Sequence, residues 1–450
     1  MPQRIQADDK MLNILSNRTY RHLFLAQVIA LVGTGLATVA LGLLAYDLAG
    51  AAAGEVLGTA LAIKMIAYIG VAPVAAAFAG RVPRRAMLVA LDLVRAGIAL
   101  ALPFVDQIWQ VYLLIFLLQS ASAAFTPTFQ ATIPDVLPDE KDYTRALSLS
   151  RLAYDLENVV SPTLAAALLT VVSFHSLFGG TVVGFIVSAA LVVSVRLPSP
   201  KATVRRGIYD RTTRGLRIYL ATPRLRGLLA LNLAVAAASA MVIVNTVVLV
   251  QAGFGLTQQA TAWALAAFGG GSMLAALVLP RLLDRLPDRS TMLTGSGVLV
   301  AGLLVGAVIP NYELLLGLWF VLGIGYSLAQ TPSGRLLRRS AHPEDRPALF
   351  AAQFALSHVC WLITYPVAGW VGARIGLAPT FVVLGLIAAA AVAVAVRLWP
   401  ATDPERLAHR HDDLPQDDSH LDIRDGDAHI HEYVIDDRHR QWPSKKGSSR

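Results

Sequence analysis

The sequence predicts an all-α integral membrane protein whose twelve transmembrane helices form two pseudo-symmetric bundles of six. Three observations support this fold class. The chain has 450 residues, of which 55% are hydrophobic and 15% charged, whereas soluble domains carry about 25% charged residues. Apolar runs of roughly 18 residues or more, each able to cross a hydrocarbon core of about 30 Å as a helix, recur along it. Short motifs also repeat at a fixed spacing near half the chain length.

Twelve apolar runs define the predicted transmembrane helices. The first run is too long for the core of a signal peptide, and no small-residue cleavage site follows it. We therefore expect all twelve runs to span the membrane. In order, they cover residues 23–48, 56–79, 86–105, 108–133, 152–172, 177–195, 228–252, 260–279, 291–309, 312–334, 349–373 and 377–396.

Two short basic motifs occupy equivalent places in the predicted halves. Residues 80–86 read GRVPRRA and residues 284–290 read DRLPDRS, and each motif lies between two apolar runs. An offset of 204 residues superimposes their arginines, and the same offset places Pro162 on Pro366. Self-similarity at a fixed spacing indicates a duplicated half, and duplicated membrane halves are typical of transporters.

The formal net charge of +8 follows the predicted topology. Most of the 38 Lys and Arg residues lie in the N-terminal segment and in the loops after even-numbered runs, whereas the loops after odd-numbered runs hold only Arg374. By the positive-inside rule, both termini then face the cytoplasm, and we expect a bacterial inner-membrane location. The basic excess is thus explained by a lipid bilayer. We expect no nucleic-acid partner, no cofactor and a monomer.

Composition divides the chain into five segments. The central connector is basic, with nine Lys or Arg and one acidic residue over residues 196–226, and residues 208–220 are expected to form an interfacial helix. The last segment holds twelve acidic residues and six of the ten histidines, so we expect a largely disordered tail in which only the apolar residues 433–435 and 442–443 dock on the body. The segments are an N-terminal cytoplasmic stretch (1–20), the first bundle (21–196), the connector (197–226), the second bundle (227–398) and the tail (399–450).

The repeat, the central connector and the two basic motifs resemble the major facilitator superfamily. The family motif contains Asp-Arg followed by a further Arg, which Asp284, Arg285 and Arg289 match, whereas Gly80 stands where the first copy usually has Asp. The resemblance implies the major facilitator fold and a cytoplasmic gate whose charges engage the opposite half in one state and release it in the other. The gating residues it implies are Arg81, Arg85, Asp92, Arg95, Asp284, Arg285 and Arg289.

Polar residues inside the predicted helices are candidate functional residues, because an ionisable group costs several kcal/mol in a bilayer unless it is paired or hydrated. Lys64 lies about 13 Å from the nearer end of its helix, too deep to reach the interface easily, and either serves the substrate or pairs with a carboxylate. The resemblance implies that helices two, five, eight and eleven form the seam between the halves. The expected substrate-binding residues are Lys64, Asp155, Asn158, Asn232, Asn245, Gln330, His358 and Cys360.

Proton coupling is expected at three of the seam residues. A carboxylate in a low-dielectric seam and a histidine can both exchange a proton near neutral pH. Asp155 or Glu157 is the expected proton carrier, with His358 as a second titrating group. Structural roles remain open: Asp155 can pair with Arg151 one turn earlier, His358 can hydrogen-bond a backbone carbonyl, and Cys360 can be a small packed residue.

The histidines of the tail suggest metal binding. Imidazole and carboxylate groups together hold Ni, Co or Zn weakly without a fixed geometry. The tail loosely resembles those of nickel-resistance exporters, and the chain as a whole is also loosely similar to enterobactin-exporter-like members; a solvated acidic tail is the alternative. The expected metal ligands are His409, His411, His420, His429, His431 and His439.

The sequence favours a proton-coupled exporter over an enzyme, since no nucleophile–base or metal motif stands at a recognisable spacing. Export is favoured because Ser161-Pro162 resembles the Gly-Pro of the exporters' fifth helix. A divalent cation (Ni, Co or Zn) is the first substrate hypothesis, because seam carboxylates with His358 and Cys360 suit such an ion. A small organic compound, either a drug or a siderophore, is the second. A non-transporting metal sensor is the alternative from another class, and the duplicated gate motifs argue against it.

Overall fold

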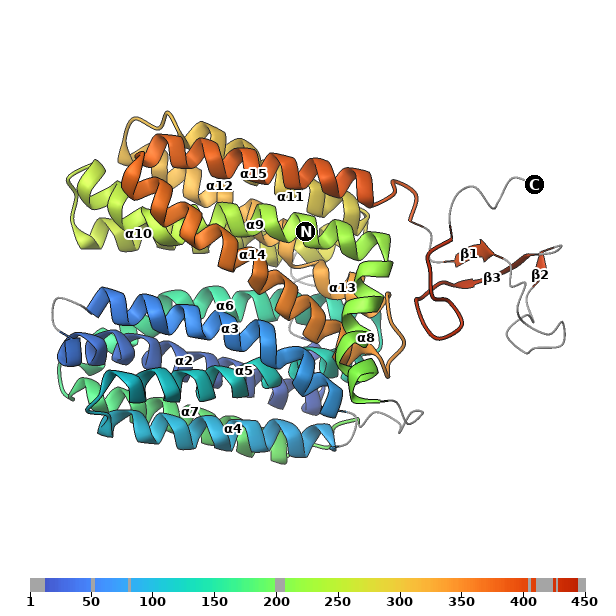
Figure 1. Ribbon diagram of the computed structural model, residues 1–450, viewed down its shortest axis with the longest axis horizontal. Coiled ribbons are helices and arrows are strands. Elements are labelled where there is room, and N and C mark those ends of the chain that lie inside the picture. Colours follow the sequence, from blue (N-terminus) through green and yellow to red (C-terminus); the bar gives the residue numbers. More distant parts are fainter. Residues whose placement is uncertain are drawn as a thin grey trace, which may run out of the picture.

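Two bundles of six long helices lie side by side and make up the body of the protein (Figure 1). The computed structural model describes residues 13–49, 53–79, 82–198, 207–403, 406–409, 424–425 and 428–443. The first bundle begins after a short 3-10 turn, η1 (Asn13–Ser16). It consists of α2 (Arg18–Ala49), α3 (Ala53–Ala79), α4 (Arg84–Ala101), α5 (Ile108–Val136), α6 (Glu140–Leu168) and α7 (Phe174–Val193).

The second bundle repeats this arrangement, and three short elements extend helices of the two bundles. These are η3 (Leu102–Phe104) after α4, the π-helical η4 (Val248–Gly253) after α9, and α13 (Ser333–Arg338) after α12. The six long helices are α9 (Pro223–Val247), α10 (Gln258–Leu283), α11 (Asp288–Gly306), α12 (Tyr312–Gln330), α14 (Arg346–Arg374) and α15 (Leu377–Leu398).

Ten helices in the described part of the chain are long and apolar enough to cross a membrane, and α3 adds a shorter apolar stretch over residues 62–78. The predicted all-α fold with two six-helix bundles is confirmed. The prediction is wrong at the start of α6, which begins at Glu140, twelve residues before the apolar run. Asp139 caps this helix by accepting hydrogen bonds from the Lys141 and Asp142 N–H groups at 2.9 and 3.0 Å.

Close packing between helices depends on small residues. Gly271 of α10 and Gly323 of α12 face each other's helix so closely that a Cβ on either would clash with a backbone carbonyl, of Phe320 or Phe268 respectively. The glycine-rich stretch 268–272 is therefore a helix-packing surface, as expected of small residues in membrane helices. Trp319 completes this core, since its Nε1–H donates to Thr246 Oγ1 at 2.8 Å.

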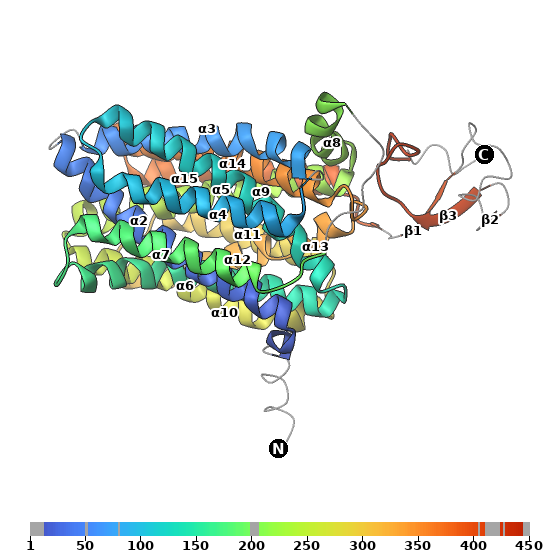
Figure 2. The same cartoon turned by 90° about the horizontal axis from the view of Figure 1, so that it is seen from below.

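The connector helix α8 (Ile208–Ala221) forms as predicted and packs against the second bundle. Its Gly215 lies against the backbone of Ala348, where a Cβ would clash with the carbonyl oxygen. Tyr219 donates a hydrogen bond of 2.5 Å to Gln353 of α14. The helix that joins the two halves is thus fastened to the start of α14 (Figure 2).

The C-terminal tail is more ordered than predicted. Strands β1 (Arg406–His409), β2 (Arg424–Asp425) and β3 (Ala428–Glu432) form an antiparallel sheet in the order β1-β3-β2. Residues 433–435 are buried against the body beside Trp399 and Leu336, so the predicted docking is confirmed. Three consecutive apolar side chains provide the buried surface in an otherwise acidic segment.

Candidate functional site

Ion pairs join the two halves at one end of the body. We call this end the basic end; in Figure 1 it is the end that carries α8 and α13. This end carries α8, α13 and the first turns of α4, α6, α11 and α14. Arg346 of α14 pairs with Asp135 of the first half, with 2.7 Å between Nη1 and Oδ1. Arg335 of α13 pairs with Glu140 of the first half at 2.5 Å. We call these two pairs the latch.

Asp135 and Arg335, one residue from each latch pair, also bind a charged partner within their own half. Asp135 pairs with Arg84 of α4, and Arg335 lies 3.2 Å from Asp288 of α11. Arg84 is 2% exposed, so the network is shielded from water at its core. The charges that cross between the halves are therefore positioned by partners in the half from which they come.

Further contacts between the halves lie at the basic end or deeper in the seam. Arg338 donates to the Pro138 carbonyl, and its guanidinium lies 5.5 Å from the centre of the Tyr143 ring. Deeper in, Arg151 of α6 donates to the Tyr326 hydroxyl of α12 at 3.2 Å and lies 4.5 Å from the centre of that ring. These contacts close the seam at the basic end.

A polar cluster lies midway along the seam, about 18–25 Å from the basic ends of its helices at 1.5 Å per residue. The Lys64 ammonium is 5.5 Å from the centre of the Tyr68 ring in α3, and that ring meets His358 of α14 edge-on at 4.7 Å. Glu157 of α6 is half-buried, and the charge of Lys64 acts on both Glu157 and His358. The structure thus brings together three predicted site residues from both halves.

Tyr68 is the member of this seam cluster that the sequence reasoning missed. Its hydroxyl donates to Gln119 of α5 at 2.8 Å, and its ring contacts Phe354 as well as His358, at 4.8 Å between ring centres in the Phe354 contact. A tyrosine in an apolar helix carries no charge to mark it. Its spacing of four residues from Lys64, which puts both on one helix face, is the signal that could have identified it.

Asp155 pairs with Arg151, which is the structural role that the sequence left open for it. It is 3% exposed and engaged by Arg151 one turn earlier, with the Arg151 Nε at 3.2 Å from Oδ2 and a second contact to Oδ1. A carboxylate held through both oxygens by a guanidinium is positioned to hold Arg151 against Tyr326. Asp155 is therefore engaged in an ion pair within its own helix.

Other predicted substrate residues lie inside the second half. Asn245 of α9 donates to the Ala368 carbonyl of α14 at 3.1 Å, and Cys360 lies 4.0 Å from the Leu229 carbonyl of α9. Both side chains therefore join α14 to α9 instead of facing the seam. Asn232 is buried in the same bundle, with an amide nitrogen that lacks a hydrogen-bond partner among the described residues.

The remaining predicted substrate residues lie on α14, α12 and α6. His358 Nδ1 lies 2.6 Å from the Phe354 carbonyl, which is the backbone hydrogen bond given as the alternative. Gln330 is half-buried at the end of α12 and its carbonyl accepts from Ser333 at 2.6 Å. The Asn158 side chain lies outside the described part of α6.

The predicted gating pair Asp92 and Arg95 lies within the first half and does not reach the second. Asp92 is fully buried, pairs with Arg95 and accepts a hydrogen bond of 2.8 Å from Ser188 of α7. The Arg95 guanidinium lies 4.0 Å from the centre of the Phe125 ring of α5. The gating prediction for this pair is therefore corrected: it fastens α4 to α5 and α7.

Replacing Asp92 with Asn is expected to destabilise the protein by about 3–5 kcal/mol, because it leaves Arg95 charged and buried without its carboxylate. The double variant with Arg95→Gln should cost less than the sum of the two single changes. Thermal unfolding, followed by reaction of the single thiol of Cys360 with a fluorescent dye, measures the difference. Asp106→Asn at an exposed site is the control, and an Asp92→Asn midpoint equal to that of this control would contradict the assignment.

The basic motifs themselves do not supply the crossing charges. Asp284 and Arg285 are exposed at the end of α10, and Arg289 donates to the Trp399 carbonyl of its own half at 3.1 Å. Arg85 is half-buried, and Arg81 lies outside the described residues. In this conformation the charges that cross between the halves therefore come from residues outside the two motifs, at the same end of the body.

The predicted metal sites are not assembled in the described part of the chain, where no group of three or more His, Cys, Asp or Glu side chains is placed to hold a metal ion. In the seam, Cys360 faces α9 and Asp155 is paired with Arg151. His439 is buried and bonds Asp436 at 3.0 Å. Of the other tail histidines, His409, His429 and His431 are described by their backbone alone, and His409 lies opposite His429 in the sheet. His411 and His420 lie outside the described residues.

The tail docks through a carboxylate between two imidazoles. Asp436 lies 3.0 Å from His439 and 3.5 Å from His342, which precedes α14. Burial acts to raise the pKa of Asp436, but hydrogen bonds from both imidazoles outweigh it and hold the pKa far below its usual value. The hydrogen bond to Asp436 raises the pKa of His342 above its ordinary value of about 6.5.

Tail docking is therefore expected to weaken as the pH rises from 6 to 8. The pKa of His342 is higher in the docked tail than in the undocked one. Protonated His342 therefore stabilises docking fully at a pH below its undocked pKa, and this stabilisation is lost as the pH rises through its docked pKa. Asp436 stays charged over this range. Hydrogen–deuterium exchange of residues 433–439, corrected for intrinsic rates, measures the change. His342→Gln should remove the pH dependence and His175→Gln should keep it; equal profiles in both variants would contradict the assignment.

Two helical halves that close on each other at one end, with polar residues of both halves meeting midway along the seam, are the architecture of a membrane transporter built from a repeated half. The chain belongs to the Major Facilitator Superfamily, since the model of that family matches residues 23–246 and 228–432. It is accordingly a membrane transporter and not an enzyme.

Relatives with assigned names include efflux proteins. The multidrug efflux pump Tap of Mycobacterium tuberculosis is 27% identical over 403 residues, which cover 85% of this chain and 94% of Tap. The uncharacterized transporter YfiS of Bacillus subtilis is 22% identical over 335 residues, covering 70% and 78%. Macrolide efflux protein A of Streptococcus pyogenes is 25% identical over 155 residues, covering 32% and 38%.

Solved structures share the fold at low identity. The human organic anion transporter MFSD10 superimposes with a TM-score of 0.74 at 12% identity, covering 84% of this chain and 99% of that one. A bacterial homologue of the iron transporter ferroportin, in an outward-facing state, gives 0.70 at 15% identity, covering 84% and 98%. Such identities establish the fold and leave the substrate to the site itself.

Proposed function

We propose that the protein exports small amphipathic organic compounds in exchange for protons. The observation that carries the proposal is the seam cluster, in which the charge of Lys64 acts on Glu157 and on His358, beside the aromatic rings of Tyr68 and Phe354. Aromatic surface with a few charged groups suits an organic ligand better than a bare cation. The efflux functions in the names of Tap and macrolide efflux protein A support export.

In this proposal Glu157 carries the proton. It is half-buried, and a Cβ on Gly35 of α2 would lie 2.9 Å from its Oε1, so it sits where α6 meets α2. The described residues give it no guanidinium partner, unlike Asp155. Lys64 can then balance the charged form of Glu157 while the substrate is away, which gives proton and substrate a common site for which they compete.

The proposed orientation puts the basic end in the cytoplasm, in line with the positive-inside rule. With the latch formed, the seam is closed to the cytoplasm, which corresponds to an outward-facing conformation. Proton binding from outside would precede opening of the latch, and substrate would enter from the cytoplasm after it.

Growth of a host lacking its own efflux pumps tests the substrate class. Cells expressing the protein should tolerate at least about fourfold more ethidium, erythromycin or tetracycline, which corresponds to a modest free-energy difference of less than 1 kcal/mol. Nickel, cobalt and zinc salts form the second arm, in which no protection is expected. Protection from the metals with no change for any organic compound would overturn the proposal and restore the metal hypothesis. Lys141→Gln, at an exposed site, serves as the expression-matched control for Lys64→Gln, which should lose protection.

A further inference from the structure

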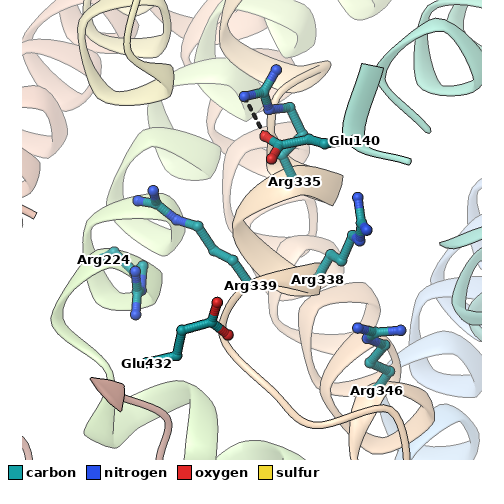
Figure 3. A pocket seen from close by; sticks show the side chains of 7 residues that line it. All are labelled: Glu140, Arg224, Arg335, Arg338, Arg339, Arg346 and Glu432. Atoms are coloured by element: carbon teal, nitrogen blue, oxygen red, sulfur yellow. Dashed lines mark ion pairs between the residues drawn. The ribbon is translucent and has the colours of Figure 1, made fainter. Parts of the chain in front are cut away.

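A pocket at the basic end is lined mainly by arginine. Its volume is about 220 Å³, and its lining residues come from α9, α13, the starts of α6 and α14, and the tail (Figure 3). Drug-sized ligands occupy pockets of about 300–1,000 Å³, so this one is too small for the exported compound. The lining consists of Arg224, Arg335, Arg338, Arg339, Arg346, Glu140 and Glu432.

Carboxylates are too few for the guanidinium groups in and around this pocket. Asp403 serves both Arg224, at 3.3 Å, and Arg339. In the same way Asp135 serves both Arg84 and Arg346. Each of these two carboxylates is thus shared between two guanidinium groups, and the lining itself holds five arginines and two glutamates.

Three of the lining arginines retain hydrogen-bonding capacity. Arg338 donates to a backbone carbonyl and lies over an aromatic ring, and the described residues provide no carboxylate for it. The buried Nε–H groups of Arg339 and Arg346 have no hydrogen-bond partner in the described part of the chain. Figure 3 shows these guanidinium groups around the pocket, with Glu140 and Glu432 as the only acids.

We propose that this pocket binds a small phosphate-bearing anion, either free phosphate or pyrophosphate or the headgroup of an anionic phospholipid. Guanidinium groups bind phosphate oxygens through paired, charge-assisted hydrogen bonds, so clustered arginines select this chemistry. The site is separate from the seam cluster and goes beyond the export proposed above.

The site overlaps the latch. Arg335 and Arg346 line the pocket and also form the latch with Glu140 and Asp135. All five lining arginines belong to the second half, so a bound anion competes with first-half carboxylates for two of them.

Thermal unfolding of the purified full-length protein tests the site. Sodium pyrophosphate at millimolar concentration, with a chelator present, should raise the unfolding midpoint by about 2–4 °C relative to sodium chloride at equal ionic strength. Arg338→Gln/Arg339→Gln should lose at least half of the shift, whereas Arg217→Gln on the exposed side of α8 should keep it. An equal shift with chloride, or an undiminished shift in the double variant, would overturn the proposal. If the double variant does not fold, Arg338→Gln alone, compared by calorimetric titration with pyrophosphate, gives the same decision.

Nanodiscs distinguish the two sources of the anion. In phosphatidylcholine alone, pyrophosphate should stabilise the protein as it does in detergent. If the ligand is a lipid headgroup, adding phosphatidylglycerol should stabilise the wild type but not the double variant, and pyrophosphate should then add nothing. If the ligand is a free anion, the pyrophosphate shift should persist in phosphatidylglycerol. Absence of any anion effect in both nanodiscs would refute the site.

Discussion

Replacing Glu157 with Gln is expected to reduce proton-driven export by about 100-fold or more, which corresponds to about 2.7 kcal/mol or more in the driving step. Glutamine keeps the size and hydrogen-bonding groups of the side chain but cannot exchange a proton. Substrate binding should change less than transport, since Lys64, Tyr68 and His358 remain. Initial rates of substrate efflux under an imposed pH gradient, with protein amount held equal, measure the loss.

Two controls separate this role from a general defect. Glu313→Gln removes an exposed carboxylate at the start of α12 and should transport normally. Exchange of labelled for unlabelled substrate without a pH gradient should survive in Glu157→Gln, because exchange needs substrate binding and movement but no net proton transfer. If Glu157→Gln transports like Glu313→Gln under the gradient, Glu157 is not the proton carrier and His358 is the next candidate.

Breaking the latch is expected to open the basic end. The Arg346–Asp135 pair exists only when the halves are closed, whereas the Arg84–Asp135 pair lies within one half and exists in both states. Loss of the Arg346–Asp135 pair should therefore destabilise the closed state by about 1–2 kcal/mol. This free energy corresponds to a shift of about 5–30-fold in the equilibrium between the closed and the open state. A cysteine at Leu147, which packs beside Gly334 of the other half, should react that much faster with a polar maleimide when Asp135→Asn is introduced into a Cys360→Ala background.

Non-additivity identifies the pair. Asp135→Asn and Arg346→Gln should each accelerate labelling, and together they should accelerate it no more than the larger single effect, since they remove one interaction. Asp142→Asn is the matched control, because Asp142 pairs with Arg145 of the same helix at 2.6 Å. Fully additive effects, or equal acceleration by Asp142→Asn, would show that the latch does not hold the basic end shut.

The fold could be predicted because apolar run length and internal repetition are properties of the chain alone. Eleven of the twelve runs match their helices within a few residues, and the exception, α6, begins in a polar stretch where hydropathy gives no signal. The midway cluster was predicted in part, since Lys64, Glu157 and His358 are ionisable residues in apolar helices. Tyr68 was not predicted, because an uncharged tyrosine in an apolar helix gives no signal in the hydropathy or the charge pattern.

The latch could not be predicted from motif resemblance, but the repeat held a signal for it. An offset of 204 pairs Arg84 with Asp288, Asp135 with Arg339, and Asp142 with Arg346. Each pair reverses its charge, so the two halves present complementary charges at equivalent positions of the basic end. The topology prediction uses only the Lys and Arg residues among these six, whereas the structure places Asp135, Arg346 and Asp288 in the network between the halves.

Which polar helix residues face the seam also needed the structure. Asn245 and Cys360 have the residue types of binding groups, yet their helix faces meet α9 or α14 inside one bundle. Sequence spacing fixes neighbours on one helix but not the partner helix that a face meets. The seam part of the metal hypothesis depended on such faces meeting, whereas Cys360 lies against α9 and Asp155 pairs with Arg151.

The central claim is that proton entry through Glu157 drives an organic compound across the membrane. Its most direct test is ethidium accumulation in proteoliposomes whose lumen is more acidic than the medium. Ethidium carries a permanent charge, so it does not gather in an acidic lumen by itself as a weak base does. The account predicts accumulation with the wild type, abolished by a protonophore and by Glu157→Gln. Accumulation that is independent of the pH gradient, or undiminished in Glu157→Gln, would contradict it.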